Sequence, residues 1–248
     1  MLGKLLKYEF IYLVKDFAKT YIIYGATVLI FSILVLGGSS ASGTAFATLF
    51  GIFAVIYYIF TFLLAILTIS HNVRRFKKNM FSHEGYLTNT LPVTPSQHVI
   101  AKVIVGAVNY VISFVVIYLG FTIVMLCAGG ADEFKRSMDL MIRYLNHFDL
   151  LFPTFLMLAT GYLALLLCCY LVSAVSNMVG GSKGKGALLA IAFVILYIFL
   201  SVILSSALVD GGTSPAGIMY VYSLVYAAGA VGEFFAITHI IRNSLNLQ

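Results

Sequence analysis

Residues 150–178 read LLFPTFLMLATGYLALLLCCYLVSAVSNM, and this stretch contains no charged side chain. A helix needs about 20 mostly apolar residues to cross the hydrocarbon core of a bilayer. Strands of a transmembrane β-barrel are only about 10 residues long and alternate polar with apolar side chains. The stretch is too long and too uniform for such a strand, so it predicts a transmembrane helix.

Five further segments have the same character and complete a set of six predicted spans. Apolar residues make up 61% of the 248-residue chain and charged residues 10%, whereas soluble domains carry about 25% charged residues. A soluble fold of this length cannot bury so much apolar surface. We therefore expect one all-α, polytopic membrane domain over residues 1–248, with spans at 20–38, 45–70, 99–128, 150–178, 187–209 and 218–241.

The basic residues divide unequally between the two sides of these spans. Twelve lie on the side of the leader and the tail, and three lie on the other side. Loops rich in Lys and Arg stay in the cytoplasm, so both chain ends are predicted to be cytoplasmic. Lys102, near the start of the third span, is expected to extend back to the headgroups. The basic charge indicates contact with anionic lipid rather than with nucleic acid.

The leader, residues 1–17, has apolar residues at every third or fourth position: Leu2, Leu6, Phe10, Leu13 and Phe17. This spacing predicts an amphipathic helix along the cytoplasmic interface. The simpler interpretation is a charged anchor before the first span. Residues 131–148 carry a similar apolar stripe and predict a short helix on the outer surface. Because residues 1–19 lack a convincing cleavage site, we expect the first span to remain as a membrane anchor.

The longest predicted cytoplasmic segment, residues 71–98, separates the second span from the third. It begins with a basic cluster and ends with a helix-start signal. Thr94 can cap the helix, Pro95 suits its first position, and Gln97 completes the capping-box spacing. The third helix is therefore expected to begin inside the cytoplasm.

Motifs for catalysis are incomplete in this sequence. The Gly184–Lys185 pair lacks the earlier glycine and the following Ser or Thr of a phosphate-binding loop. His83 and Glu84 begin like a zinc-protease helix, but the second His is missing. The three cysteines lie in or beside predicted spans and are interpreted as small core residues. We expect no enzyme activity, cofactor or metal site in the chain itself.

One acidic side chain, Glu233, lies inside a predicted span. A carboxylate in lipid is costly, so it should face a protein interior or a water-filled cavity. At 1.5 Å per residue it lies about 12 Å from the cytoplasmic end of its span. Small residues surround it and permit close helix packing. The sequence leaves two interpretations open, a structural carboxylate between helices and part of a transport pathway.

The cytoplasmic segment resembles a known family. Residues 78–102 read KNMFSHEGYLTNTLPVTPSQHVIAK. A Phe, an acidic residue with Gly-Tyr-Leu, then Thr-Leu-Pro-Val and a Lys are typical of type 2 permeases of ATP-binding-cassette transporters, known mainly from Gram-positive bacteria. The opening MLGKLLKYEF is also similar to the start of such proteins. The short outer loop between spans five and six departs from relatives that have re-entrant helices there.

The resemblance implies that residues 79–90 form a short helix that docks on a separate ATPase subunit, which binds the ATP. The expected interface residues are Phe81, His83, Glu84, Gly85, Tyr86 and Leu87. Phe81, Tyr86 and Leu87 would be its apolar anchors. The resemblance further implies a second permease subunit, the same or related, and transport of a hydrophobic compound or peptide, in the direction of export, across a bacterial cell membrane.

Other interpretations of the same residues stay open at this point. The segment 79–90 could instead lie as a loop on the lipid headgroups. The whole chain could be a non-transporting immunity or sensor protein of the membrane. It could also be an ion-coupled carrier that uses Glu233 as its coupling site.

Overall fold

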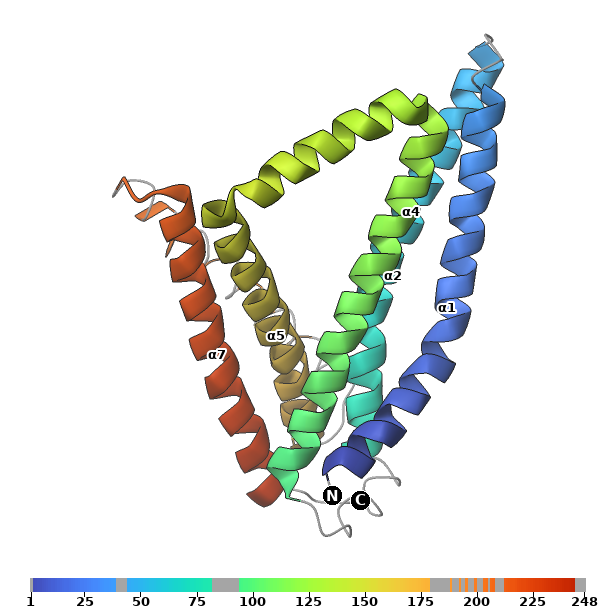
Figure 1. The fold of residues 1–248 in the computed structure, drawn as a ribbon. Helices are drawn as coiled ribbons and strands as arrows, with labels where there is room; N and C mark the ends of the chain where they lie inside the picture. Colours follow the sequence, from blue (N-terminus) through green and yellow to red (C-terminus); the bar gives the residue numbers. More distant parts are fainter. Residues whose placement is uncertain are drawn as a thin grey trace. The chain divides into compact units, whose positions relative to one another are not determined.

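A computed structural model describes residues 2–38, 44–81, 94–178 and 212–243, together with eight single positions between 188 and 207. Within these parts the chain is all-helical and contains no strand, which confirms the predicted fold class (Figure 1). The long helices are α1 (Leu2–Gly38), α2 (Thr44–Phe81), α4 (Pro95–Asn146), α5 (Phe148–Met178) and α7 (Pro215–Asn243).

All five helices are long and apolar enough to cross a membrane. Their candidate spans are Leu5–Gly37, Gly51–Phe81, Pro95–Cys127, Phe148–Asn177 and Pro215–Arg242. Five of the six predicted spans thus coincide with long apolar helices. The predicted span at 187–209 falls outside the described residues except for the eight single positions, and each of these is helical.

Three helices extend well beyond the predicted spans. α1 runs without a break through the predicted leader and the first span, and α2 continues to Phe81. α4 has 52 residues and joins the third span to most of the predicted outer segment. Figure 1 shows α4 changing direction sharply in its second half. Its sequence contains Gly129 and Gly130, small residues of the kind found at helix kinks.

Local capping explains where two of the helices begin. The backbone N–H of Thr94 donates to the Gln97 side-chain oxygen at 3.3 Å, which is one half of the predicted capping box. At the start of α7, the N–H of Gly217 donates to Ser214 Oγ at 3.2 Å, and Pro215 occupies the first helical position. The capping side chains satisfy backbone donors that a helix start leaves without partners.

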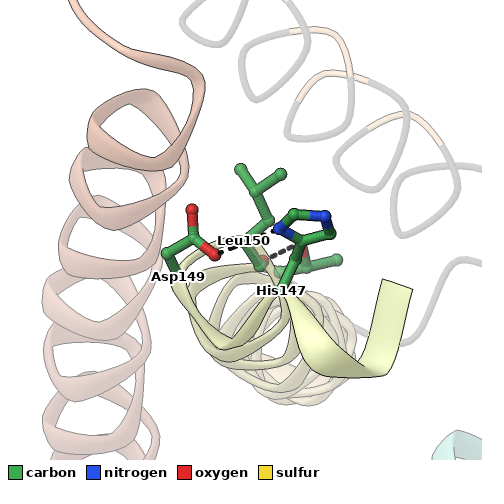
Figure 2. A network of polar contacts seen from close by, with 4 residues as sticks. His147, Asp149 and Leu150 are labelled. Atoms are coloured by element: carbon green, nitrogen blue, oxygen red, sulfur yellow. Dashed lines mark hydrogen bonds and ion pairs between the residues drawn. The ribbon is translucent and has the colours of Figure 1, made fainter. Parts of the chain in front are cut away.

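The start of α5 has a polar turn of its own. The carbonyl of His147 accepts hydrogen bonds from the N–H groups of Leu150 and Leu151, each at 3.0 Å. Figure 2 shows the His147 ring and the Asp149 carboxylate facing one another, with Nδ1 and Oδ1 3.9 Å apart. Both side chains are exposed, so the pair adds little stability. Asp149 in the first turn also complements the helix dipole.

The chain divides into two compact units. The bundle unit comprises Lys7–Ser70 and Val108–Asn146, and so contains most of α1, α2 and α4. The α5/α7 unit comprises Met1–Leu6, His71–Ala107 and His147–Gln248. It contains α5 and α7 together with the last part of α2 and the first part of α4.

The bundle unit has an apolar core shared by its three helices. Buried members are Tyr24, Val28, Phe31 and Val35 of α1, Tyr57 and Leu64 of α2, and Val124 of α4. Phe31 stacks on Tyr57 at a ring distance of 5.2 Å, whereas Tyr24 reaches Thr61. The contact of the later α1 residue, Phe31, is with the earlier α2 residue, Tyr57. The helices α1 and α2 are therefore antiparallel.

In the α5/α7 unit, α5 and α7 pack against each other as parallel helices. Thr154 Oγ1 lies 3.3 Å from Met219 Sδ. Seven residues further along both helices, Gly161 packs on the Tyr226 ring, where an added Cβ would lie 3.4 Å from Cδ2. Because both contacts advance in the same direction, α5 and α7 point the same way.

Candidate functional site

Glu233 lies at the contact between α7 and α5. It lies near Cys168 and Cys169 of α5, and this pairing continues the parallel progression along the two helices. Ile237 and Ile241 follow on the same side of α7 and are buried. The Glu233 side chain is therefore directed toward the protein interior, as expected for a carboxylate within an apolar span.

One oxygen of this carboxylate is buried and lacks a hydrogen bond. Glu233 Oε2 has no hydrogen-bond partner among the residues that the structure describes. A buried carboxylate without partners is unfavourable when ionised, so such a group is rarely retained for packing alone.

The small residues around Glu233 were predicted to allow close packing, and at Gly232 the described residues do not show it. A Cβ added to Gly232 would have no neighbour among them within 4 Å. Close packing between α5 and α7 occurs instead at Gly161, which contacts the Tyr226 ring.

An apolar groove of about 390 Å³ lies in the α5/α7 unit. α7 contributes Ala230, Val231, Phe234 and Phe235, and every lining residue is apolar. Glu233 is close to these four residues in sequence but does not line the groove.

Two other helices complete the groove. α5 contributes Leu163 and Leu167, and Leu167 directly precedes Cys168. The first turns of α4 contribute Ile100, Val103 and Ile104. The groove therefore lies where three helices of the α5/α7 unit meet, and no sequence motif indicated it.

The predicted ATPase-coupling segment begins at the end of α2. Phe81 is the last residue of α2, and its ring makes an edge contact with Phe76 at 5.7 Å. Phe76 in turn stacks on Tyr170 of α5 at 4.2 Å, and both rings are almost completely buried. The other predicted interface residues, His83, Glu84, Gly85, Tyr86 and Leu87, lie outside the described residues.

Polar side chains at the junction of α2, α4 and α5 were not predicted from the sequence. Asn72 Nδ2 donates to Tyr162 Oη at 3.2 Å, and Tyr162 Oη donates to the Gly106 carbonyl at 3.0 Å. Lys102, predicted to extend to the headgroups, is instead buried at 5% exposure. Its position four residues before Gly106 places it on the interior face of α4.

A second polar network joins all three helices of the bundle unit. Tyr21 Oη donates to Asn109 Oδ1 at 3.1 Å and lies 2.9 Å from Ser113 Oγ. Thr68 Oγ1 lies 2.9 Å from Ser113 Oγ and donates to the Leu64 carbonyl at 2.8 Å. The hydroxyl groups of Tyr21, Thr68 and Ser113 therefore take part in four short contacts, and each of the three has a hydrogen-bonding partner.

Comparison with known proteins adds no family assignment. No family model, no curated protein and no solved structure matches the chain. Among the described residues, no group of three or more His, Cys, Asp or Glu side chains is placed to hold a metal ion. The structural features available for a functional hypothesis are therefore the apolar helices, the end of α2, the buried carboxylate of Glu233 and the apolar groove of the α5/α7 unit.

Proposed function

We propose that the chain is the transmembrane subunit of an ATP-binding-cassette transporter, which moves a hydrophobic compound or peptide with energy from a separate ATPase subunit. The observation that carries this proposal is the aromatic row Phe81–Phe76–Tyr170. The row connects the residue at which the family-like motif begins to the buried interior of α5. A force applied to the motif segment would therefore reach a second apolar helix through packed rings.

The parallel direction of α5 and α7 supports a six-span plan. Two parallel helices that both cross a membrane require a return crossing between them. The chain between Met178 and Pro215 is long enough to supply it, because about 20 helical residues suffice. The described positions between 188 and 207 are helical, in agreement with the span predicted at 187–209. An even number of spans keeps both chain ends on one side.

The dense packing behind Phe81 suits a coupling element. Phe76 and Met80 of α2, Val99 of α4 and Ala174 of α5 are all fully buried. Cores packed to this density transmit displacement rather than absorb it. A docked ATPase would consequently move α2, α4 and α5 together rather than bend a single loop.

The proposal is tested by affinity purification of the tagged chain from its native membrane. We expect an ATPase subunit to co-purify, and we expect Phe81→Ala with Tyr86→Ala to reduce its recovery at least about tenfold, since truncated aromatic anchors commonly cost 2 kcal/mol or more. ATP hydrolysis by the purified complex should fall in parallel.

The matched control removes aromatic rings elsewhere on the chain. Phe62→Ala with Phe155→Ala truncates two exposed rings of α2 and α5, which are 68% and 67% exposed. This variant should retain the ATPase. If no ATPase is recovered with the wild-type chain, even after crosslinking in the membrane, the transporter proposal is wrong.

One observation favours a second candidate, an ion-coupled carrier. Glu233 Oε2 is buried and has no hydrogen-bond partner among the described residues, which is a feature of proton-coupling carboxylates in transporters. This candidate predicts that the purified chain alone, reconstituted in vesicles, conducts protons down an imposed gradient without ATP. Glu233→Gln would abolish that flux. A chain that carries no flux without an ATPase excludes the carrier.

A further inference from the structure

The apolar groove of the α5/α7 unit opens to the surroundings of α7. Two of its lining residues, Val231 and Phe235, are 55% and 66% exposed, and every lining residue is apolar. Its volume of about 390 Å³ lies within the range of about 300 to 1,000 Å³ that is usual for small-molecule sites. Because α7 is long and apolar enough to cross a membrane, its exposed apolar side borders the hydrocarbon core. The groove can therefore hold a hydrocarbon chain.

One cation lies on the same side of α7 as the groove. Val231, Phe235 and Arg242 are spaced by four and seven residues, which places them on one face of the helix. Arg242 is exposed and is the last residue of the candidate span. At 1.5 Å per residue, it lies about 10 Å beyond Phe235 along the helix axis. Glu233 precedes Arg242 by nine residues, or about two and a half turns, and so lies on the opposite side of α7.

The groove lies near the end of the unit at which α7 ends and α4 begins. α4 contributes Ile100, Val103 and Ile104, all within its first ten residues. Figure 1 shows the first turns of α4 and the last turns of α7 at this same end.

Basic residues gather at this end of the unit. Within the described ranges 71–81, 94–107 and 230–243, the one acidic residue is Glu233. The same ranges contain six Lys and Arg residues, which are Arg74, Arg75, Lys77, Lys78, Lys102 and Arg242. The electrostatic potential around the exposed Arg242 is therefore positive and attracts anions.

These features select an amphiphile with a hydrocarbon chain and an anionic head. A neutral apolar molecule would fill the groove without using Arg242, and a soluble anion would contact Arg242 without using the groove. A zwitterionic lipid carries a cation of its own, which the surrounding Lys and Arg side chains repel. Anionic phospholipids combine a hydrocarbon chain with a negative headgroup, and basic pockets between transmembrane helices bind such headgroups.

We propose that the groove and Arg242 together bind an anionic phospholipid, with one acyl chain between α4, α5 and α7 and the phosphate against the Arg242 guanidinium. The guanidinium fork matches the geometry of phosphate oxygens. The interval of about 10 Å between Phe235 and Arg242 leaves room for the glycerol backbone and the first part of the chain. The proposal goes beyond the proposed function, because it applies to an ATP-driven transporter and to an ion-coupled carrier alike.

The experiment measures lipid binding to the purified full-length chain in dodecyl maltoside by native mass spectrometry. Dioleoyl phosphatidylglycerol and dioleoyl phosphatidylcholine are the probes, because they share their acyl chains and differ in headgroup charge. Titration of each lipid gives the dissociation constant of the first bound molecule. We expect the wild-type chain to bind phosphatidylglycerol at least about fivefold more tightly than phosphatidylcholine, since a single basic side chain near the headgroups accounts for about that factor.

The headgroup contact is tested by changing the charge of Arg242. Arg242→Gln should remove the preference by weakening phosphatidylglycerol binding about fivefold without changing phosphatidylcholine binding. Arg242→Lys keeps a positive charge and should retain most of the preference. The matched control is Arg74→Gln, which removes the same charge from an exposed position of α2, a helix that contributes no described residue to the groove. This control should bind both lipids like the wild type.

The chain contact is tested by filling the groove. Val231→Phe places a larger side chain in it and should weaken binding of both lipids. Because Val231 is more than half exposed, this variant is expected to fold. Leu224→Phe is its control, since Leu224 precedes Val231 by seven residues on the same face of α7, is 70% exposed and lies outside the groove lining. The control should bind both lipids like the wild type.

Equal affinity for the two lipids in the wild type would overturn the proposal, as would a preference that Arg242→Gln leaves unchanged. Equal losses in Arg242→Gln and Arg74→Gln would overturn it too, because they would show a general attraction of the basic end. Equal losses in Val231→Phe and Leu224→Phe would exclude the groove. Displacement of phosphatidylglycerol by glycerophosphoglycerol, its headgroup without chains, would show a surface anion site instead. None of these measurements depends on an ATPase or on proton flux, so the lipid site and the proposed function can fail separately.

Discussion

The bundle unit and the α5/α7 unit both place polar side chains within apolar helices, and the hydrogen-bond network of the first differs from Glu233 of the second. In the bundle unit, Tyr21, Thr68, Asn109 and Ser113 connect three helices, and each is hydrogen-bonded to another member. In the α5/α7 unit, Glu233 keeps one buried oxygen without a hydrogen-bond partner in the described part of the chain. The four residues of the bundle unit connect its helices, whereas Glu233 keeps a hydrogen-bond acceptor without a partner among the described residues.

Two glycine positions, one in each unit, differ in how closely they are packed. In the bundle unit, a Cβ added to Gly120 would lie 2.8 Å from Tyr24 Oη and 3.0 Å from Val28 Cγ2. In the α5/α7 unit, a Cβ added to Gly232 would meet no atom of the described residues within 4 Å, whereas one added to Gly106 would lie 2.6 Å from Leu166 Cδ2. Close helix packing therefore occurs in both units, and Gly232 is an open position within a unit that is closely packed elsewhere.

The largest expected effect tests this difference in packing. Gly120→Val introduces a branched side chain against Tyr24 and Val28, and should lower the free energy of unfolding by about 2–3 kcal/mol through overpacking. Gly232→Val introduces the same side chain into open space and should change stability by less than about 0.5 kcal/mol. Reversible unfolding in sodium dodecyl sulfate, followed by helical circular dichroism, measures both.

The two glycine variants control for each other, because the intrinsic helix propensity changes by the same amount in each. Similar stability of the two variants would show that Gly120 is not the more closely packed of the two positions. Destabilisation by Gly232→Val alone would reverse the comparison.

A smaller effect is expected when the hydrogen-bond network is broken. Asn109 is fully buried, and Asn109→Leu removes the acceptor of the Tyr21 hydroxyl while keeping a similar volume. We expect a loss of about 1–2 kcal/mol, because hydrogen bonds between membrane helices contribute about 0.6–2 kcal/mol each. Thr68→Val should cost less, since Ser113 can then turn its hydroxyl to Tyr21. Unfolding of the double variant shows whether the two losses are coupled.

Much of the helical architecture can be predicted from hydrophobicity and local signals. The ends at Gly38 and Met178 coincide with predicted span ends, because apolar runs stop there. The start of α4 follows its capping box. The extensions of α1, α2 and α4 beyond the spans were missed, because helices continue past the hydrocarbon edge wherever tertiary packing supports them.

The interior face of α4 could have been found from its polar and small residues. His98, Lys102, Gly106, Asn109 and Ser113 recur every three or four positions and are all buried. In a membrane helix the lipid-facing side is apolar, so such a stripe marks the side that faces protein. The charge of Lys102 alone predicts a position at the headgroups, whereas its place in the stripe predicts that it is buried.

The groove and the partners of Glu233 could not be predicted in this way. They depend on which residues of α4, α5 and α7 come together, and these residues are far apart in the sequence. Hydropathy gives the length of each helix but not its rotation or its neighbours. The sequence therefore predicts that Glu233 faces the interior, while the apolar groove of the α5/α7 unit follows only from the assembled helices.

The smallest effect on stability is expected at Glu233 itself. Glu233→Gln keeps the shape of the side chain and removes its ionisable group. Oε2 has no hydrogen bond to lose among the described residues, and the neutral amide is less costly to bury than a carboxylate. The free energy of unfolding should therefore stay within about 0.5 kcal/mol of the wild type or increase.

Ser32 is a reference without charge, because its buried hydroxyl also lacks a partner in the described part of the chain. Ser32→Ala should likewise leave the free energy of unfolding nearly unchanged. A loss of more than about 1 kcal/mol in Glu233→Gln would mean that the carboxylate holds helices together as the Tyr21–Asn109 pair does. The contrast between a structural network and an available acceptor would then no longer separate Glu233 from the hydrogen-bond network of the bundle unit.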